Sequence, residues 1–208
     1  MPVQDELAFT SEDAWSGGAF EVLFYFDGAS SAAPDLALKV LWNLPTLVGC
    51  WHDRDVEPTE PERVAPGSVE CESAQKLYGI VTLPGRMRVA CSSWHFRDEN
   101  GSWLYFGIPM GSLGRAFPVG AYPFDDGTPT DWILPMSEWL QEIAASVFAE
   151  VRFAAGAIGW LSDNDLDCVL AATEGVIPSQ RWIGILKREG ESLKWYPPNE
   201  LSPPIQTE

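Results

Sequence analysis

The sequence has few basic residues, and this shortage limits the partners that the chain can bind. Its 208 residues include 13 Lys and Arg against 30 Asp and Glu, for a formal net charge of −17. A surface of this charge repels nucleic acid phosphates and anionic membranes. We therefore expect no binding to nucleic acid or to membranes, and we expect cations or a basic protein as partners.

Histidine and cysteine are also scarce, with two and four residues. The cysteines form no C-x-x-C pair, and the chain contains no G-x-G-x-x-G, Walker, G-x-S-x-G or H-E-x-x-H motif. These motifs are typical of dinucleotide-binding proteins, nucleotide hydrolases, serine hydrolases and zinc proteases. Their absence leaves the question of an enzyme open and predicts no cofactor.

The first fifteen residues lack the basic and apolar regions of a signal peptide. No apolar run approaches the roughly 18 residues that a membrane-spanning helix needs. We expect a cytoplasmic protein with reduced thiols.

Aromatic residues, by contrast, are plentiful. Ten Trp and ten Phe stand in a chain that is 46% hydrophobic, which is enough for a sizeable core. Residues 20–26, FEVLFYF, predict a buried strand, and Asn100-Gly101 between two aromatic-rich runs predicts a hairpin because both residues tolerate positive φ. The expected strands are 20–26, 47–53, 76–83, 86–97, 102–108, 153–161, 181–187 and 193–196, and the expected helices are 35–43, 135–151 and 163–172.

The expected elements run strand, helix, strand, strand, strand, and then repeat this order. Two segments also match locally: QKLYGIV at 75–81 and QRWIGIL at 180–186. We expect an α+β fold, with a mainly antiparallel sheet, helices packed on one face and an internal duplication of a β-α-β-β-β unit, although so short a match can also arise by chance. The expected organisation is a flexible N-terminal arm (1–17), two halves of one compact domain (18–100 and 101–198) and a C-terminal tail (199–208).

The two histidines each lie near a cysteine. Cys50 and His52 share one strand face, and Cys91 and His95 share another, because alternate residues of a strand point to the same side. If the two strands are neighbours, the four side chains could bind zinc, although their spacing matches no standard zinc motif. The competing interpretation is that no metal binds and that the cysteines are small core residues. The candidates for a catalytic group in the same region are His52, Asp53 and His95.

Residues 54–73 are rich in Pro and Glu and show no periodicity. A loop of this length is typically mobile or functional. Its acidic side chains could contact a basic partner, or they could serve solubility alone. The candidate partner-binding residues are Asp53, Asp55, Glu57, Glu60, Glu62, Asp125, Asp126 and Asp131.

Aromatic side chains of the central hairpin and of the loop after it could line a groove for a ligand. The competing interpretation is that they belong to the core. The candidate pocket residues are Trp94, Trp103, Tyr105, Phe117 and Tyr122.

Two functions from different classes fit these patterns. The first is a non-catalytic binding or inhibitory module that docks a basic protein, as small acidic immunity proteins do; the similarity is one of charge and size. The alternative is a small-ligand-binding protein or a hydrolase-type enzyme, with a pocket between the two halves near His52 and His95.

Overall fold

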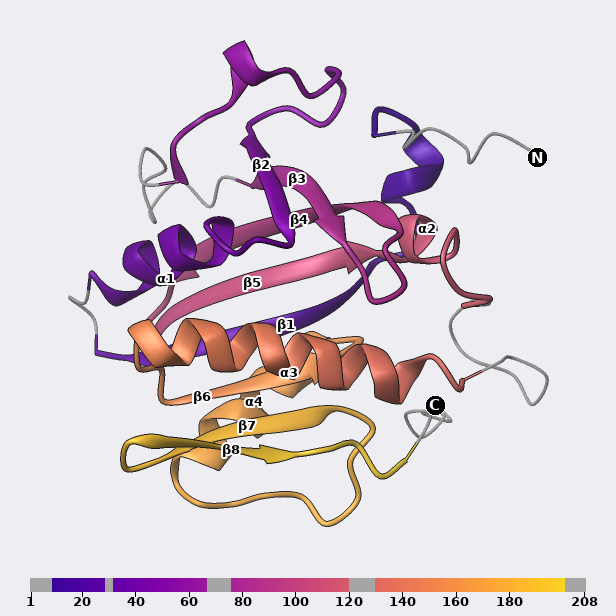
Figure 1. The fold of residues 1–208 in the computed structure, drawn as a ribbon. Coiled ribbons are helices and arrows are strands. Elements are labelled where there is room, and N and C mark those ends of the chain that lie inside the picture. The colour runs from indigo at the N-terminus through magenta and orange to yellow at the C-terminus, as the bar shows by residue number, and fades with distance from the viewer. Residues whose placement is uncertain (1–8, 29–31, 67–75, 120–129, 201–208) are drawn as a thin grey trace.

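The computed structural model describes residues 9–28, 32–66, 76–119 and 130–200 (Figure 1). Eight strands of this part form one sheet, in the order β2-β3-β4-β5-β1-β6-β7-β8, and every neighbouring pair is antiparallel. The strands are β1 (Ala19–Asp27), β2 (Leu47–Trp51), β3 (Leu77–Thr82), β4 (Arg88–Arg97), β5 (Gly101–Pro109), β6 (Ala155–Gly159), β7 (Gly184–Glu189) and β8 (Ser192–Tyr196).

Two helices cover one face of the sheet. α1 (Ala33–Trp42) and α3 (Ile133–Glu150) pack against each other and against this face (Figure 1). The apolar side of α3 is buried, as its sequence periodicity predicts, while Glu138 and Glu142 on its other side are exposed. The even-numbered residues of β1, which include Val22 and Phe24, face these helices.

The opposite face carries a second core around the odd-numbered residues Leu23 and Tyr25 of β1. α4 (Asp163–Thr173) packs there against β6 and β7. Both faces of β1 and β5 are therefore buried, which explains why β1 is almost continuously apolar. The remaining helical pieces are short: α2 (Met110–Leu113) and the 3₁₀ turns η1 (Glu12–Trp15) and η2 (Glu60–Glu62).

The predicted α+β fold with a mainly antiparallel sheet is confirmed. Packing of helices on one face holds for α1 and α3, but α4 lies on the other face, because β6 and β7 carry a second apolar set there. The internal duplication is not confirmed. The strand after α1 lies at the sheet edge, whereas the strand after α3 lies next to β1 in the centre.

The matching segments 75–81 and 180–186 have one feature in common within the described part. Gly79 of β3 lies against the ring of Trp42, and Gly184 of β7 lies against the ring of Trp195. In each case the missing side chain leaves space for an indole ring. The glycine that the two segments share is therefore explained by the packing of a tryptophan against each strand.

None of the helices in the described ranges has the length and apolar character that a membrane crossing requires.

Candidate partner-binding surface

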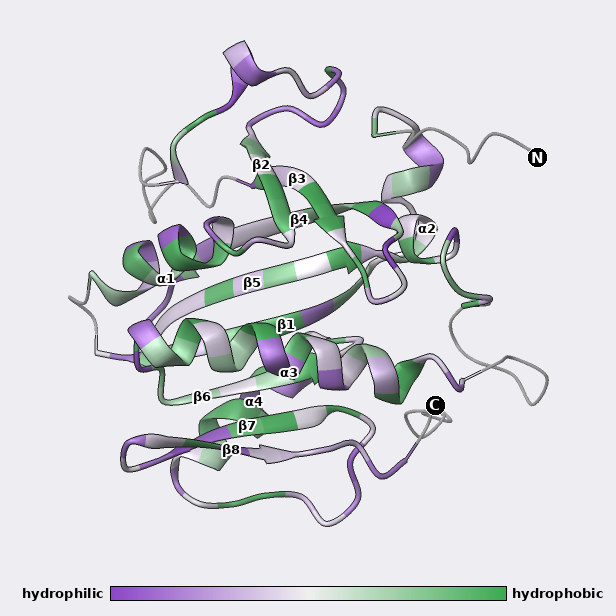
Figure 2. Cartoon of the chain, viewed as in Figure 1, coloured by the Kyte–Doolittle hydropathy of each residue, from purple (hydrophilic) through white to green (hydrophobic). Residues whose placement is uncertain are grey.

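The acidic loop predicted from the sequence projects from the end of β2. Residues 52–66, which we call the acidic protrusion, leave the sheet after Trp51 and extend beyond it (Figure 1). Most of this segment is hydrophilic (Figure 2). It contains five acidic residues and two exposed arginines, Arg54 and Arg63. Five negative and two positive charges give the segment a net charge of −3. The five exposed carboxylates are Asp53, Asp55, Glu57, Glu60 and Glu62.

Hydrogen bonds to β2 hold the returning arm of the acidic protrusion. The Val64 N–H donates to the Cys50 carbonyl oxygen at 2.8 Å, and Arg63 Nε donates to the Gly49 carbonyl oxygen at 2.6 Å. The Trp51 indole N–H crosses the loop to the Thr59 carbonyl oxygen at 2.8 Å. These bonds give the loop backbone a defined shape, so less backbone entropy is lost when a partner binds.

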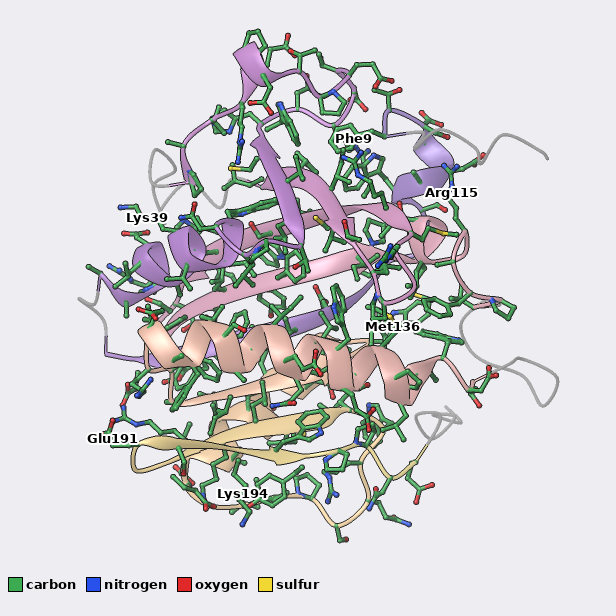
Figure 3. The ribbon with its side chains drawn as sticks, in the orientation of Figure 1. Phe9, Lys39, Arg115, Met136, Glu191 and Lys194 are labelled. Carbon is green, nitrogen blue, oxygen red and sulfur yellow. The ribbon has the colours of Figure 1, made fainter. Side chains whose placement is uncertain are left out.

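An aromatic cluster supports the base of the acidic protrusion. Phe9, which Figure 3 labels near this base, has its ring centroid 5.4 Å from that of Trp15 and 6.0 Å from that of Trp51. The rings of Trp15 and Tyr78 are 5.1 Å apart. Thr10 Oγ1 donates a hydrogen bond to Glu57 Oε1 at 3.0 Å. Residues 9–15, which the sequence assigns to the N-terminal arm, are therefore part of the support of this loop.

A shallow cavity of about 200 Å³ opens beside this base. Apolar surface from Trp51 and Val56 meets polar groups in its lining, which also includes His52, Asp53 and Glu62. An apolar patch within an acidic rim is suited to a basic side chain, whose aliphatic stem and charged end need different surroundings.

The three catalytic candidates are not gathered in this cavity. His52 and Asp53 line it, but His95 does not. His95 is only 1% exposed, and its Nδ1 lies 3.6 Å from Oδ1 of Asp35 in the first turn of α1. The structure therefore separates the two histidines between an exposed loop and the core under a helix.

The four metal-ligand candidates are also divided. Cys50 and Cys91 belong to one buried core, whereas His52 is exposed at the end of β2. Burial raises the pKa of the Cys50 thiol to about 11 and that of Cys91 well above its usual value, which disfavours the thiolates that metal binding requires. Within the described residues, no group of three or more Cys, His, Asp or Glu side chains could hold a metal ion.

Part of the candidate aromatic pocket comes together. Trp94, Trp103 and Tyr105 lie on the face of the sheet that carries α4, and the rings of Trp94 and Tyr105 stack at 4.7 Å. Phe117 packs against the core on the opposite face. Tyr122 lies outside the described residues, as do Asp125 and Asp126 of the partner-binding set, whereas Asp131 is exposed just before α3.

One candidate, Glu21, was missed by the sequence reasoning. It is the only charged residue inside the run FEVLFYF, and a charge in an otherwise apolar strand was the available signal. Burial raises its pKa to about 8, although Lys76 acts in the opposite direction. Buried carboxyl groups with strongly shifted pKa values are more frequent at functional sites.

Comparison with known protein families, with curated proteins and with solved structures finds no match to this chain. Its function is therefore inferred from the geometry described above.

Proposed function

We propose that the protein is a non-catalytic binding or inhibitory module that docks a basic protein partner through the acidic protrusion. The observation that carries this proposal is the arrangement of five exposed carboxylates on a loop whose shape is held by hydrogen bonds to β2.

The charge of the whole molecule supports the same function. A net charge of −17 attracts a basic protein over distances of several ångströms and raises the rate of encounter. The shallow cavity with Trp51 and Val56 adds an apolar contact at the base of the loop. Contacts of this kind supply the affinity that charge attraction alone does not.

A charge-reversal experiment tests this function. The triple variant Asp53→Lys, Asp55→Lys, Glu57→Lys is compared with wild type for capture of a basic protein from the source organism at low salt, followed by measurement of affinity for that protein. We expect the variant to bind at least about tenfold more weakly, because the attraction between the two surfaces is lost. We also expect wild-type affinity to fall as salt increases.

A matched control separates a local contact from net charge. The triple variant Glu138→Lys, Glu142→Lys, Glu150→Lys changes the charge by the same amount on exposed positions of α3. This control should retain wild-type affinity within about twofold, because its three substitutions lie outside the proposed contact surface. Equal losses in the two triple variants would contradict docking through the acidic protrusion.

The alternative function, a pocket near both histidines, has less support. It requires His52 and His95 in one cavity, and the cavity that His52 lines does not include His95. We therefore propose the binding module alone.

A further inference from the structure

A row of cross-strand neighbours connects the base of the acidic protrusion to Glu21. The members face the same side of the sheet as α4, and we call them the Glu21 row. In strand order they are Trp51, Tyr78, Ser92, Gly107, Glu21 and Gly159. Directly opposed side chains in an antiparallel sheet lie about 4.5–5.5 Å apart. The row thus begins at Trp51, at the base of the protrusion, and reaches Glu21 four strands further into the sheet.

The row has little side-chain bulk around Glu21. Gly107 and Gly159 flank Glu21 on its two sides, and Ser92 follows beyond Gly107. A Cβ placed on Gly107 would lie 3.0 Å from Glu21 Cβ and 3.3 Å from Glu21 Oε2. The Glu21 carboxyl group therefore extends over β5, where a larger residue at position 107 would displace it.

The carboxyl group of Glu21 is without a close cation. All 13 Lys and Arg residues lie in the described ranges, and none has its nitrogen within 4.0 Å of this group. Lys76 is the charged group that acts on it from a distance, and Tyr78 and Tyr105 are the titratable groups of neighbouring strands on this face. The residue is half-buried: its surroundings remove most of the water from the carboxyl group, but part of its surface stays open to a cation from outside.

The next pair of residues on this face of β4 and β5, beside Ser92 and Gly107, is aromatic. Trp94 lies two residues after Ser92 on β4, and Tyr105 lies two residues before Gly107 on β5, so the two are paired across the strands. Their rings stack at 4.7 Å with an interplanar angle of 18°. Lys76 Nζ already lies 5.9 Å from the centroid of the Trp94 ring. This surface thus binds one cation of the chain itself, and Trp94 is partly exposed to another.

We propose that the Glu21 row binds the side chain of an arginine or lysine of the basic partner, which pairs with the Glu21 carboxylate and lies against the Trp94–Tyr105 stack. This inference rests on the proposed function, because the row begins at Trp51 under the acidic protrusion. A guanidinium group fits best, since it can pair with a carboxylate through two hydrogen bonds and also stack on a ring.

Two capped tripeptides test this site without knowledge of the partner. Acetyl-Gly-Arg-Gly-amide is titrated into ¹⁵N-labelled protein at low salt, and acetyl-Gly-citrulline-Gly-amide, which has the same shape without the charge, is the matched probe. We expect saturable shifts of the Trp94 indole and of the Ser92 and Gly107 amides with the arginine peptide alone. Glu21→Gln should abolish them, and Glu138→Gln on α3 should have no effect.

The pH dependence adds a readout that mere attraction to a negative surface would lack. Below about pH 8 the cation must displace the proton of Glu21, so the affinity of wild type for the arginine peptide should fall by on the order of tenfold for each unit by which the pH is lowered, while Glu21→Gln should show no binding at any of these pH values. Equal binding of both peptides, unchanged binding by Glu21→Gln, or shifts confined to residues 53–62 would overturn the proposal. The peptide assay does not involve the Asp53, Asp55 and Glu57 variant, so this site and the docking function can fail separately.

Discussion

At the scale of single residues, Glu21 makes stability depend on pH. Its pKa is about 8 in the folded protein against 4.5 for an ordinary Glu, so the folded chain keeps a proton that the unfolded chain releases between these values. The free energy of unfolding should therefore fall as pH rises through this window, by about 1.4 kcal/mol per pH unit from this group. Urea denaturation of wild type and Glu21→Gln between pH 5 and pH 8.5 measures the effect.

The difference between these two proteins isolates the contribution of Glu21 from that of other carboxyl groups. Glu21→Gln should gain stability relative to wild type as pH rises, by a few kcal/mol at the upper end. A constant difference across the range would mean that Glu21 titrates as an ordinary exposed carboxyl group.

Gly79 shows how one residue determines the packing of a large side chain. A Cβ at this position would overlap the ring of Trp42, which is buried and donates its indole N–H to Ser93 Oγ at 2.9 Å. Gly79→Ala should lower the free energy of unfolding by about 1–3 kcal/mol, measured by urea denaturation. Gly85→Ala is unsuitable as a control because Gly85 has a positive φ of 90°, which disfavours any other residue. The control is Ala90→Gly in the neighbouring strand β4, because making a residue smaller cannot cause an overlap. A change of the near-ultraviolet circular dichroism of the tryptophans in Gly79→Ala alone would support the packing explanation, and unchanged stability would contradict it.

At the scale of elements, α4 depends on the polar group at its start. The Ser162 N–H and Ser162 Oγ both donate hydrogen bonds of 2.8 Å to Oδ2 of Asp165, which is 2% exposed. Ser162 and Asp165 thus form a capping box at the start of α4. Asp165→Ala should cost about 1–2 kcal/mol of unfolding free energy in thermal or urea denaturation, because it removes both bonds.

Asp167→Ala is the matched control for this change. Asp167 also lies near the start of α4 and carries the same charge, but it is exposed. We expect a change of less than about 0.5 kcal/mol for an exposed surface substitution of this kind. Similar losses in the two variants would mean that helix charge, and not the hydrogen bonds of Asp165, explains the effect.

The acidic protrusion is the element on which the proposed function depends. The sequence shows an acidic loop that is rich in proline, but three contacts outside the loop define its shape: Gly49 and Cys50 of β2, and Thr10 near the N-terminus. These partners are between 14 and 47 residues away along the chain from the residues they contact. Local sequence pattern carries no information on such pairings.

At the scale of the whole molecule, one continuous sheet joins the two predicted halves. β1 of the first half pairs with β5 and β6 of the second, so the central strands belong to both. The helices α1 and α3 cover one face, while the acidic protrusion's aromatic base, the Glu21 row and α4 share the other. This division places both proposed contact surfaces where a single partner can reach them.

The α+β class, the approximate positions of the strands and main helices, and the excess of acidic residues could all be predicted from the sequence. Apolar periodicity, Pro and Gly positions and net charge are local or summed properties, so they can be obtained without a fold. Strand order and the side of the sheet on which each element packs could be obtained only from the folded structure. Those choices separated His52 from His95 and brought Glu21 into line with Trp51. They depend on contacts between residues far apart in the chain, because a strand buries its side chains only against neighbours that the rest of the fold supplies.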